Sequence, residues 1–284
     1  MGQQVTAPSV RTRKGGPPIV MVTAYDAPGA RIADEAGVDI VLVGDSVAMV
    51  VLGYDDTLQV TMADMAHHVG AVARARPRAM VVADLPWLSY HLDRADTVRN
   101  AAALVRAGAQ AVKLEGGRRR LDMVEAILGA EIPVMGHLGL TPQSLHAFGG
   151  YRVQGKALAD VDDLIADARA LAETGCFAIV LEAVPMEVAR LVTEAVEVPT
   201  IGIGAGPHCD GQVLVFHDLL GLEDRIRPKF VRPYAALKAD EVAALAAFAA
   251  DVRSGRFPGE AESYHLSDDV ARALGTLGSA DRSA

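Results

Sequence analysis

The sequence predicts a (β/α)₈ barrel, and two regularities along the chain support that prediction. Short apolar runs alternate with alanine-rich amphipathic segments, which is the pattern of a parallel sheet with helical crossovers. Glycine closes several amphipathic segments and leads directly into the next run, as in EAGVDIVLV, RAGAQAVKL and ETGCFAIVL. The composition, 51% hydrophobic but only 5% aromatic, also suits helices packed on a buried parallel sheet.

Eight apolar runs are expected to be strands, the number that closes such a barrel. They cover residues 19–23, 40–43, 80–83, 111–114, 133–136, 178–181, 200–203 and 213–216. Helices are expected at 27–36, 61–75, 97–106, 161–173, 185–195 and 239–254, and a capping box of Thr61 and Asp64 opens the second. Because the stretch after residue 216 is irregular, the eighth helix is expected to sit unusually or to pack on a neighbour. An open doubly wound sheet is the alternative, but no dinucleotide-binding fingerprint follows the first run.

The chain is expected to form one catalytic domain over residues 17–257, with a flexible leader at 1–16 and a peripheral tail at 258–284. A net charge of −9 without a long basic block argues against nucleic acid as a partner. No apolar run reaches the roughly 18 residues of a membrane span, and the N-terminus lacks the apolar core of a secretory signal. Cys176 and Cys209 form no CxxC motif, so a reducing cytoplasm is the expected location.

Polar and charged side chains stand where the expected strands end. They are Asp45, Asp84, Lys113, Glu115, His137 and Glu182. The carboxyl ends of barrel strands form the active-site face, so these side chains should converge at one mouth. Crowded carboxylates repel one another unless a cation neutralises them. Oxygen donors without clustered cysteine or histidine favour Mg²⁺ over Zn²⁺.

Each of these six residues also has a structural interpretation. The two aspartates suit a turn or a helix cap, and Lys113 with Glu115 suits an internal ion pair. The histidine suits a buried hydrogen-bonded position, and Glu182 suits the N-terminal end of a helix. These interpretations would have to hold at five strand ends together, so a functional cluster is the stronger prediction.

Several long segments resemble the ketopantoate hydroxymethyltransferase family. They are VTAYDAPGARIADEAGVDIVLVGDS, VLGYDDTLQVT, ADLPWLSY, AVKLEGG, PVMGHLGLTPQS, GGYRVQGK, VLEAVP, IGIGAGPHCDGQVLVFHDLLG and PKFVRPY, and they run in order from about Pro17 to Tyr234. The resemblance implies a barrel of the phosphoenolpyruvate/pyruvate type. It also implies a homo-oligomer, a decamer, that transfers a one-carbon unit from 5,10-methylenetetrahydrofolate to 3-methyl-2-oxobutanoate and gives 2-dehydropantoate.

The resemblance also implies the metal site. Asp45 in GDS and Asp84 in ADLP look like direct Mg²⁺ ligands that also lie against the bound substrate. Glu115 in KLEGG looks like the third metal carboxylate, acting directly or through water. The substrate's keto and carboxylate oxygens would chelate the ion, which would stabilise an enolate.

The remaining roles concern the substrate. By the same resemblance, Ser46 and Lys113 look like contacts to the substrate carboxylate, and Glu182 in VLEAVP looks like the general base that removes the C3 proton. His137 is expected to orient a substrate oxygen, on the strength of its position at a strand end.

Two competing hypotheses come from other classes. One is a related Mg²⁺-dependent barrel lyase or mutase that acts on another 2-oxo acid, against which the LTPQS and GGYRVQG segments argue. The other is a catalytically silent barrel that serves as a scaffold or sensor, against which the complete set of strand-end acids argues.

Overall fold

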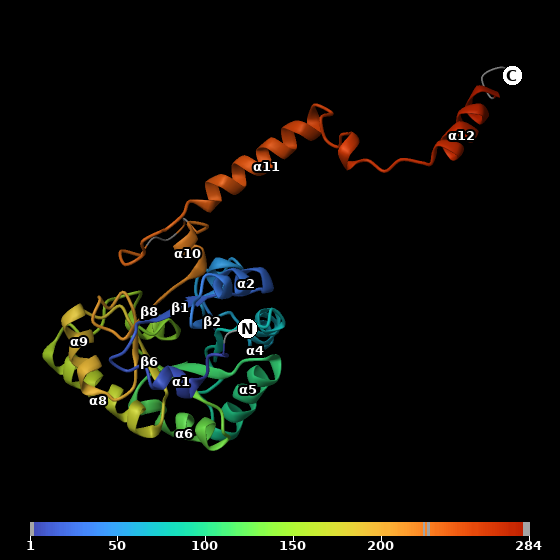
Figure 1. The fold of residues 1–284 in the computed structure, drawn as a ribbon. Coiled ribbons are helices and arrows are strands. Elements are labelled where there is room, and N and C mark those ends of the chain that lie inside the picture. Colours follow the sequence, from blue (N-terminus) through green and yellow to red (C-terminus); the bar gives the residue numbers. More distant parts are fainter. Residues whose placement is uncertain (1–2, 224, 226–227, 281–284) are drawn as a thin grey trace. The chain divides into compact units, whose positions relative to one another are not determined.

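A computed structural model describes residues 3–223, 225 and 228–280 of the chain. Its parallel strands close into a barrel in chain order, from β1 to β8 (Figure 1). The strands are β1 Ile19–Thr23, β2 Ile40–Val43, β3 Met80–Asp84, β4 Ala111–Glu115, β5 Val134–Gly139, β6 Ala178–Glu182, β7 Thr200–Ile203 and β8 Gly211–Leu214. The predicted barrel is confirmed, and the open sheet is excluded because β8 pairs with β1.

Strands β3, β4 and β6 each extend one residue beyond their expected ends, and two strands differ by more. β8 begins two residues earlier than expected because Gly211 pairs with Ile19, at a place where a side chain would collide with the Ile19 carbonyl oxygen, 2.5 Å from an added Cβ. β5 continues to Gly139, since its last residues pair with the end of β6. His137 therefore lies inside a strand and not just beyond one.

Helices surround the barrel (Figure 1). The longer ones are α2 Ala27–Glu35, α4 Met62–Arg74, α5 Arg94–Ala107, α6 Leu121–Gly129, α8 Leu158–Thr174 and α9 Met186–Ala195. The shorter turns are α3 Val47–Val50, α7 Leu145–Phe148, α10 Phe216–Leu220, η1 Arg118–Arg120 and η2 Pro142–Ser144. Thr61 and Asp64 form the predicted capping box at the start of α4. Among the described residues, no helix is long and apolar enough to cross a membrane.

The N-terminal segment, expected to be a flexible leader, packs against the barrel from residue 3 onward. Its helix α1, Ala7–Arg11, buries Val10 completely in the same apolar cluster as the interior strand residues. The Lys14 ammonium lies 3.0 Å from the Asp210 carboxylate, which fixes the end of the segment. Helix α1 packs on the barrel because Ala7 and Val10, three positions apart, lie on one apolar face of the helix. Residues 1 and 2 of the expected leader lie outside the described residues.

The chain divides into two compact units, and the division falls between Ala235 and Ala236 instead of at the expected residue 257. The second unit contains α11 Leu237–Arg253, η3 Glu260–Glu262 and α12 Asp268–Ala280. Helix α11 has no buried side chain, and it carries exposed apolar residues that include Leu245 and Phe248. Residues 281–284 of the expected tail lie outside the described residues.

Candidate active site

Strand alternation brings the predicted site residues to the barrel interior. Successive side chains of a strand point to opposite faces, so Lys113 and Glu115 of β4 share one face. The residues two positions before Asp84, Lys113, His137 and Glu182 belong to the interior apolar cluster; they are Val82, Ala111, Met135 and Val180. The register then sets Asp84 beside Lys113 and Glu115 beside His137 across neighbouring strands. The same period-two pattern therefore builds both the core and the polar mouth above it.

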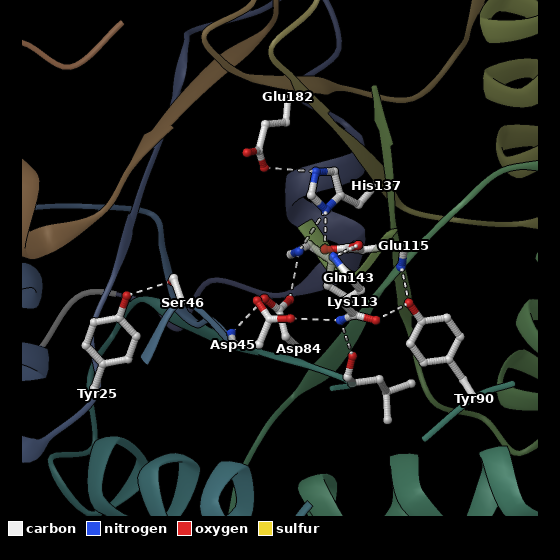
Figure 2. Close-up of polar contacts among 11 residues, drawn as sticks. Tyr25, Asp45, Ser46, Asp84, Tyr90, Lys113, Glu115, His137, Gln143 and Glu182 are labelled. Atoms are coloured by element: carbon white, nitrogen blue, oxygen red, sulfur yellow. Dashed lines mark hydrogen bonds and ion pairs between the residues drawn. The ribbon is translucent and has the colours of Figure 1, made fainter. Parts of the chain in front are cut away.

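Lys113 lies among the acids and the histidine (Figure 2). Its Nζ is 2.9 Å from Asp84 Oδ1 and 3.2 Å from His137 Nδ1. The other nitrogen of the His137 ring, Nε2, is 3.2 Å from Glu182 Oε2. Because an ammonium group can only donate, Nδ1 must accept and the ring proton must lie on Nε2, facing Glu182. The histidine thus faces the Glu182 carboxylate, at the distance but not with the geometry of an ordinary hydrogen bond.

Asp45 and Ser46 reach the same mouth from the turn after β2. The Asp45 backbone N–H donates to Asp84 Oδ2 at 3.1 Å. Gly44 precedes them, and a Cβ there would lie 2.9 Å from Ser46 Oγ and 3.4 Å from Asp84 Oδ2. The Ser46 hydroxyl is 2.8 Å from the Tyr25 hydroxyl, which fixes its position. Glycine is therefore what leaves room for the Ser46 hydroxyl in this turn.

Negative charge exceeds positive charge in this cluster. Burial and the nearby Asp84 raise the pKa of Asp45 to about 7. Burial and then Asp45 raise the pKa of Glu115 well above its usual value, and burial raises that of Glu182 to about 7. For Lys113, burial lowers the pKa, but the surrounding acids outweigh that effect and the net shift is upward. Without a further cation, protons must therefore replace part of the missing positive charge.

The pKa of His137 is shifted downward. Burial is the main cause, and the charge of Lys113 adds to it. The imidazole is therefore neutral near pH 7, with one nitrogen that donates and one that accepts. A neutral ring can lie beside both Lys113 and Glu182 without adding a charge to the mouth.

The donor chemistry of Asp45, Asp84 and Glu115 fits a hard divalent cation. All three side chains are buried carboxylates, and hard cations prefer oxygen ligands. Asp84 Oδ1 also has no hydrogen bond of ordinary geometry within the described part of the chain, only the ion pair with Lys113. No three Asp, Glu, His or Cys side chains among the described residues are already arranged as a formed metal site. The case for a divalent cation thus rests on the oxygen donors of the three carboxylates and on the excess of negative charge in the cluster.

Two functional candidates were not found from the sequence, Gln143 and Tyr90. Gln143 is buried and its Nε2 donates to Asp45 Oδ2 at 2.8 Å, while its backbone N–H donates to Glu115 Oε2 at 3.0 Å. The Tyr90 hydroxyl donates to Gln143 Oε1 at 2.6 Å. Gln143 lies in η2 beyond β5, and Tyr90 lies in the loop beyond β3, where strand periodicity gives no signal. The LTPQS and ADLPWLSY motifs were the available signals.

All seven predicted site residues come together in one region. Asp45, Asp84, Lys113, Glu115, His137 and Glu182 lie at the mouth, and Ser46 joins them through the turn at Gly44 (Figure 2). Lys113 and Glu182 contact other site side chains here, so their roles toward a substrate remain predictions.

Comparison with known proteins matches residues 4–260 to the ketopantoate hydroxymethyltransferase family. Similar relatives include two proteins named 3-methyl-2-oxobutanoate hydroxymethyltransferase. The one from Methylobacterium sp. (strain 4-46) is 58% identical over 92% of this chain and 91% of that protein. The one from Moorella thermoacetica is 57% identical over 92% of this chain and 98% of that protein.

Similar solved structures come from more distant proteins. Phosphonopyruvate hydrolase is 13% identical, with a TM-score of 0.61 over 99% of this chain and 98% of that one. Phosphoenolpyruvate phosphomutase from Streptomyces platensis subsp. rosaceus is 17% identical, with a TM-score of 0.60 over 98% of both chains. At these identities the likeness shows the fold, and it agrees with the predicted (β/α)₈ barrel.

Proposed function

Because the chain belongs to the ketopantoate hydroxymethyltransferase family, it is a hydroxymethyltransferase, and we propose how its site carries out the reaction. The one-carbon unit comes from 5,10-methylenetetrahydrofolate and goes to C3 of 3-methyl-2-oxobutanoate, giving 2-dehydropantoate. Asp45, Asp84 and Glu115 hold Mg²⁺, and Glu182 is the general base. Family membership sets aside both the lyase or mutase hypothesis and the silent barrel.

The observation that carries this proposal is the different surroundings of the four acids. Asp84 is paired with Lys113, whereas Asp45 and Glu115 are held by Gln143. Glu182 instead contacts the neutral His137 and has a pKa raised by burial to about 7. A carboxylate with a pKa near the working pH is suited to accept a proton and return it.

Glu182 would act on the C3 hydrogen of the substrate. Its carboxylate takes the proton, and the electron pair left at C3 forms the new bond to the folate methylene carbon as one of that carbon's bonds to a folate nitrogen breaks. Water then displaces the second folate nitrogen and supplies the hydroxyl of 2-dehydropantoate, and tetrahydrofolate leaves. The Nε2–H of His137 faces the carboxylate and would orient it during this transfer. Lys113 and Ser46 would bind the substrate carboxylate, and His137 borders the space where a substrate oxygen would lie.

Mg²⁺ bound at the three carboxylates would supply Lewis-acid polarisation of the substrate carbonyl, which acidifies the C3 hydrogen. The chain's contribution is the excess of buried carboxylates that such an ion would neutralise. Among the similar solved structures, one of phosphonopyruvate hydrolase is a complex with oxalate and Mg²⁺, which supports this choice of ion.

Removal of the metal is expected to abolish hydroxymethyl transfer. The measurement is the formation of 2-dehydropantoate from both substrates, before and after treatment with a chelator and then with added Mg²⁺. Activity should be lost with the chelator and regained with Mg²⁺, because the carbonyl cannot be polarised without the ion. Full activity after complete chelation would contradict the metal assignment. A failure to form the product with Mg²⁺ present would contradict the reaction itself.

A homo-oligomer, namely a decamer in the cytoplasm, completes the proposal. The exposed apolar side chains of α11 support association, because such surfaces favour burial against another chain. Two free cysteines support a reducing compartment. Light scattering should give about ten times the 29.8 kDa mass of one chain. A monomer at micromolar concentration would contradict the proposed decamer. The location is tested by cell fractionation, in which separation of the protein from cytosolic markers would contradict a cytoplasmic location.

A further inference from the structure

We propose that Gln143 and Tyr90 are positioning residues that hold the metal carboxylates in a binding arrangement before any ion arrives. This inference rests on the proposed function, because it assigns the metal to Asp45, Asp84 and Glu115. Neither positioning residue would touch the ion or the substrate in this role. Gln143 would act through the carboxylates that it contacts, and Tyr90 would act through Gln143.

Gln143 contacts the ends of three neighbouring strands. Its side-chain Nε2 donates to Asp45 Oδ2, beyond β2, at 2.8 Å and to the Leu85 carbonyl oxygen, beyond β3, at 3.0 Å. Its backbone N–H donates to Glu115 Oε2, at the end of β4, at 3.0 Å. Leu85 directly follows Asp84. One buried residue beyond β5 therefore holds two of the proposed metal carboxylates directly and the backbone next to the third (Figure 2).

The contacts leave one oxygen of each bridged carboxylate available. Gln143 engages Oδ2 of Asp45 and Oε2 of Glu115, so Oδ1 and Oε1 are not used by it. Its donors are neutral, so they orient the carboxylates without competing with a cation for their charge. A lysine or arginine at this position would neutralise the acids that the ion needs. Glutamine therefore orders the ligands and preserves their charge.

Tyr90 determines which way the Gln143 amide faces. The Tyr90 hydroxyl accepts from the Glu115 backbone N–H at 3.2 Å, so its own proton is free to donate to Gln143 Oε1 at 2.6 Å. With the amide oxygen held there, the amide nitrogen must face Asp45 and Leu85, both of which can only accept. Without the hydroxyl, the amide could rotate and present its oxygen to the Asp45 carboxylate.

The test is the affinity of the protein for Mn²⁺ or Mg²⁺ without substrates, measured by calorimetry or, for Mn²⁺, by electron paramagnetic resonance. Gln143→Met keeps the side-chain volume and the backbone donor but removes the amide. We expect it to weaken metal binding about 10–100-fold, the usual effect of losing an orienting partner. Tyr90→Phe keeps the ring and should weaken binding about 2–10-fold, because the Gln143 amide loses the hydrogen bond from the hydroxyl. In both variants, saturating metal should restore much of kcat.

Gln110→Met is the matched control. Gln110 accepts from the Val81 backbone N–H at 2.9 Å, and it lies just before β4, at the opposite end of the strand that carries Glu115. Its loss should lower the melting temperature but leave metal affinity unchanged. Wild-type metal affinity in Gln143→Met and Tyr90→Phe would overturn the inference, and so would an equal loss in Gln110→Met. If Gln143→Met fails to fold, Tyr90→Phe alone decides.

These outcomes are separable from failure of the proposed function. If the wild-type protein bound neither ion, or formed no 2-dehydropantoate with Mg²⁺, the proposed function itself would fail. If the wild type binds the ion and turns over while the variants bind it equally well, only the positioning role fails.

Discussion

Glu182→Gln is expected to lower kcat by about 10²–10⁴-fold, the contribution that a general base makes in such reactions. The amide has nearly the same shape as the carboxylate but cannot accept the C3 proton. His137 Nε2, 3.2 Å from Glu182 Oε2, can still contact the amide oxygen, so the mouth should keep its geometry. Binding of 3-methyl-2-oxobutanoate should therefore persist while its conversion nearly stops.

The decisive measurement is exchange of the C3 hydrogen of 3-methyl-2-oxobutanoate with tritiated water, which isolates proton removal from the later transfer step. Exchange should fall together with kcat. The matched control is Glu187→Gln, an exposed acid in the first turn of α9, which should exchange and turn over as the wild type does. Exchange at the wild-type rate in Glu182→Gln would assign the base to another residue.

The wild-type pH profile offers a second check on Glu182. Burial raises its pKa to about 7, and the base must be ionised to accept a proton. Activity should therefore be lost as the pH falls through that value, by about tenfold per unit below it, and should be retained above it. At saturating Mg²⁺, which favours ionised Asp45, the residual activity of Glu182→Gln should lack this acid limb, since the variant has no carboxylate at position 182 to protonate.

Much of this site was predictable because it depends on strand alternation. Lys113 and Glu115 had to share a face once β4 was recognised, and β3 and β6 each end in an acidic side chain by the same pattern. The closed barrel followed from eight repeated units. No comparable local rule applies to Gln143, whose buried position depends on how the loop after β5 folds over three other strand ends.

The N-terminal segment is a second feature that local sequence pattern did not predict. Its composition is polar, and residues 1–16 were therefore expected to be flexible. In the structure Val10 is buried with the interior strand residues, and Val5 donates a backbone hydrogen bond to the Arg78 carbonyl oxygen at 3.0 Å. These contacts join residues about 70 positions apart in the chain, so local pattern cannot reveal them. The boundary at Ala235 is likewise set by tertiary contacts and not by composition.

Asp84→Asn is expected to reduce activity by about 10³-fold or more, because it removes a metal ligand and the partner of Lys113 together. Lewis-acid polarisation contributes several kcal/mol to such a reaction, and about 4 kcal/mol corresponds to 10³-fold in rate. Asp84 Oδ1 lies 2.9 Å from Lys113 Nζ, so the neutral amide also leaves a buried ammonium without its ion-pair partner. Two measurements are needed, kcat at saturating Mg²⁺ and the rise in melting temperature that Mg²⁺ causes.

Asp210→Asn is the matched control for this substitution. Asp210 is also an aspartate paired with a lysine, since its carboxylate lies 3.0 Å from Lys14 Nζ, but it precedes β8 and so lies at the opposite end of the barrel. Its loss should lower the melting temperature while kcat and the stabilisation by Mg²⁺ stay near the wild-type values. If Asp84→Asn behaves in the same way, keeping kcat within tenfold and its response to Mg²⁺, then Asp84 is a structural ion-pair partner. The ion would in that case have to be held by Asp45 and Glu115 without it.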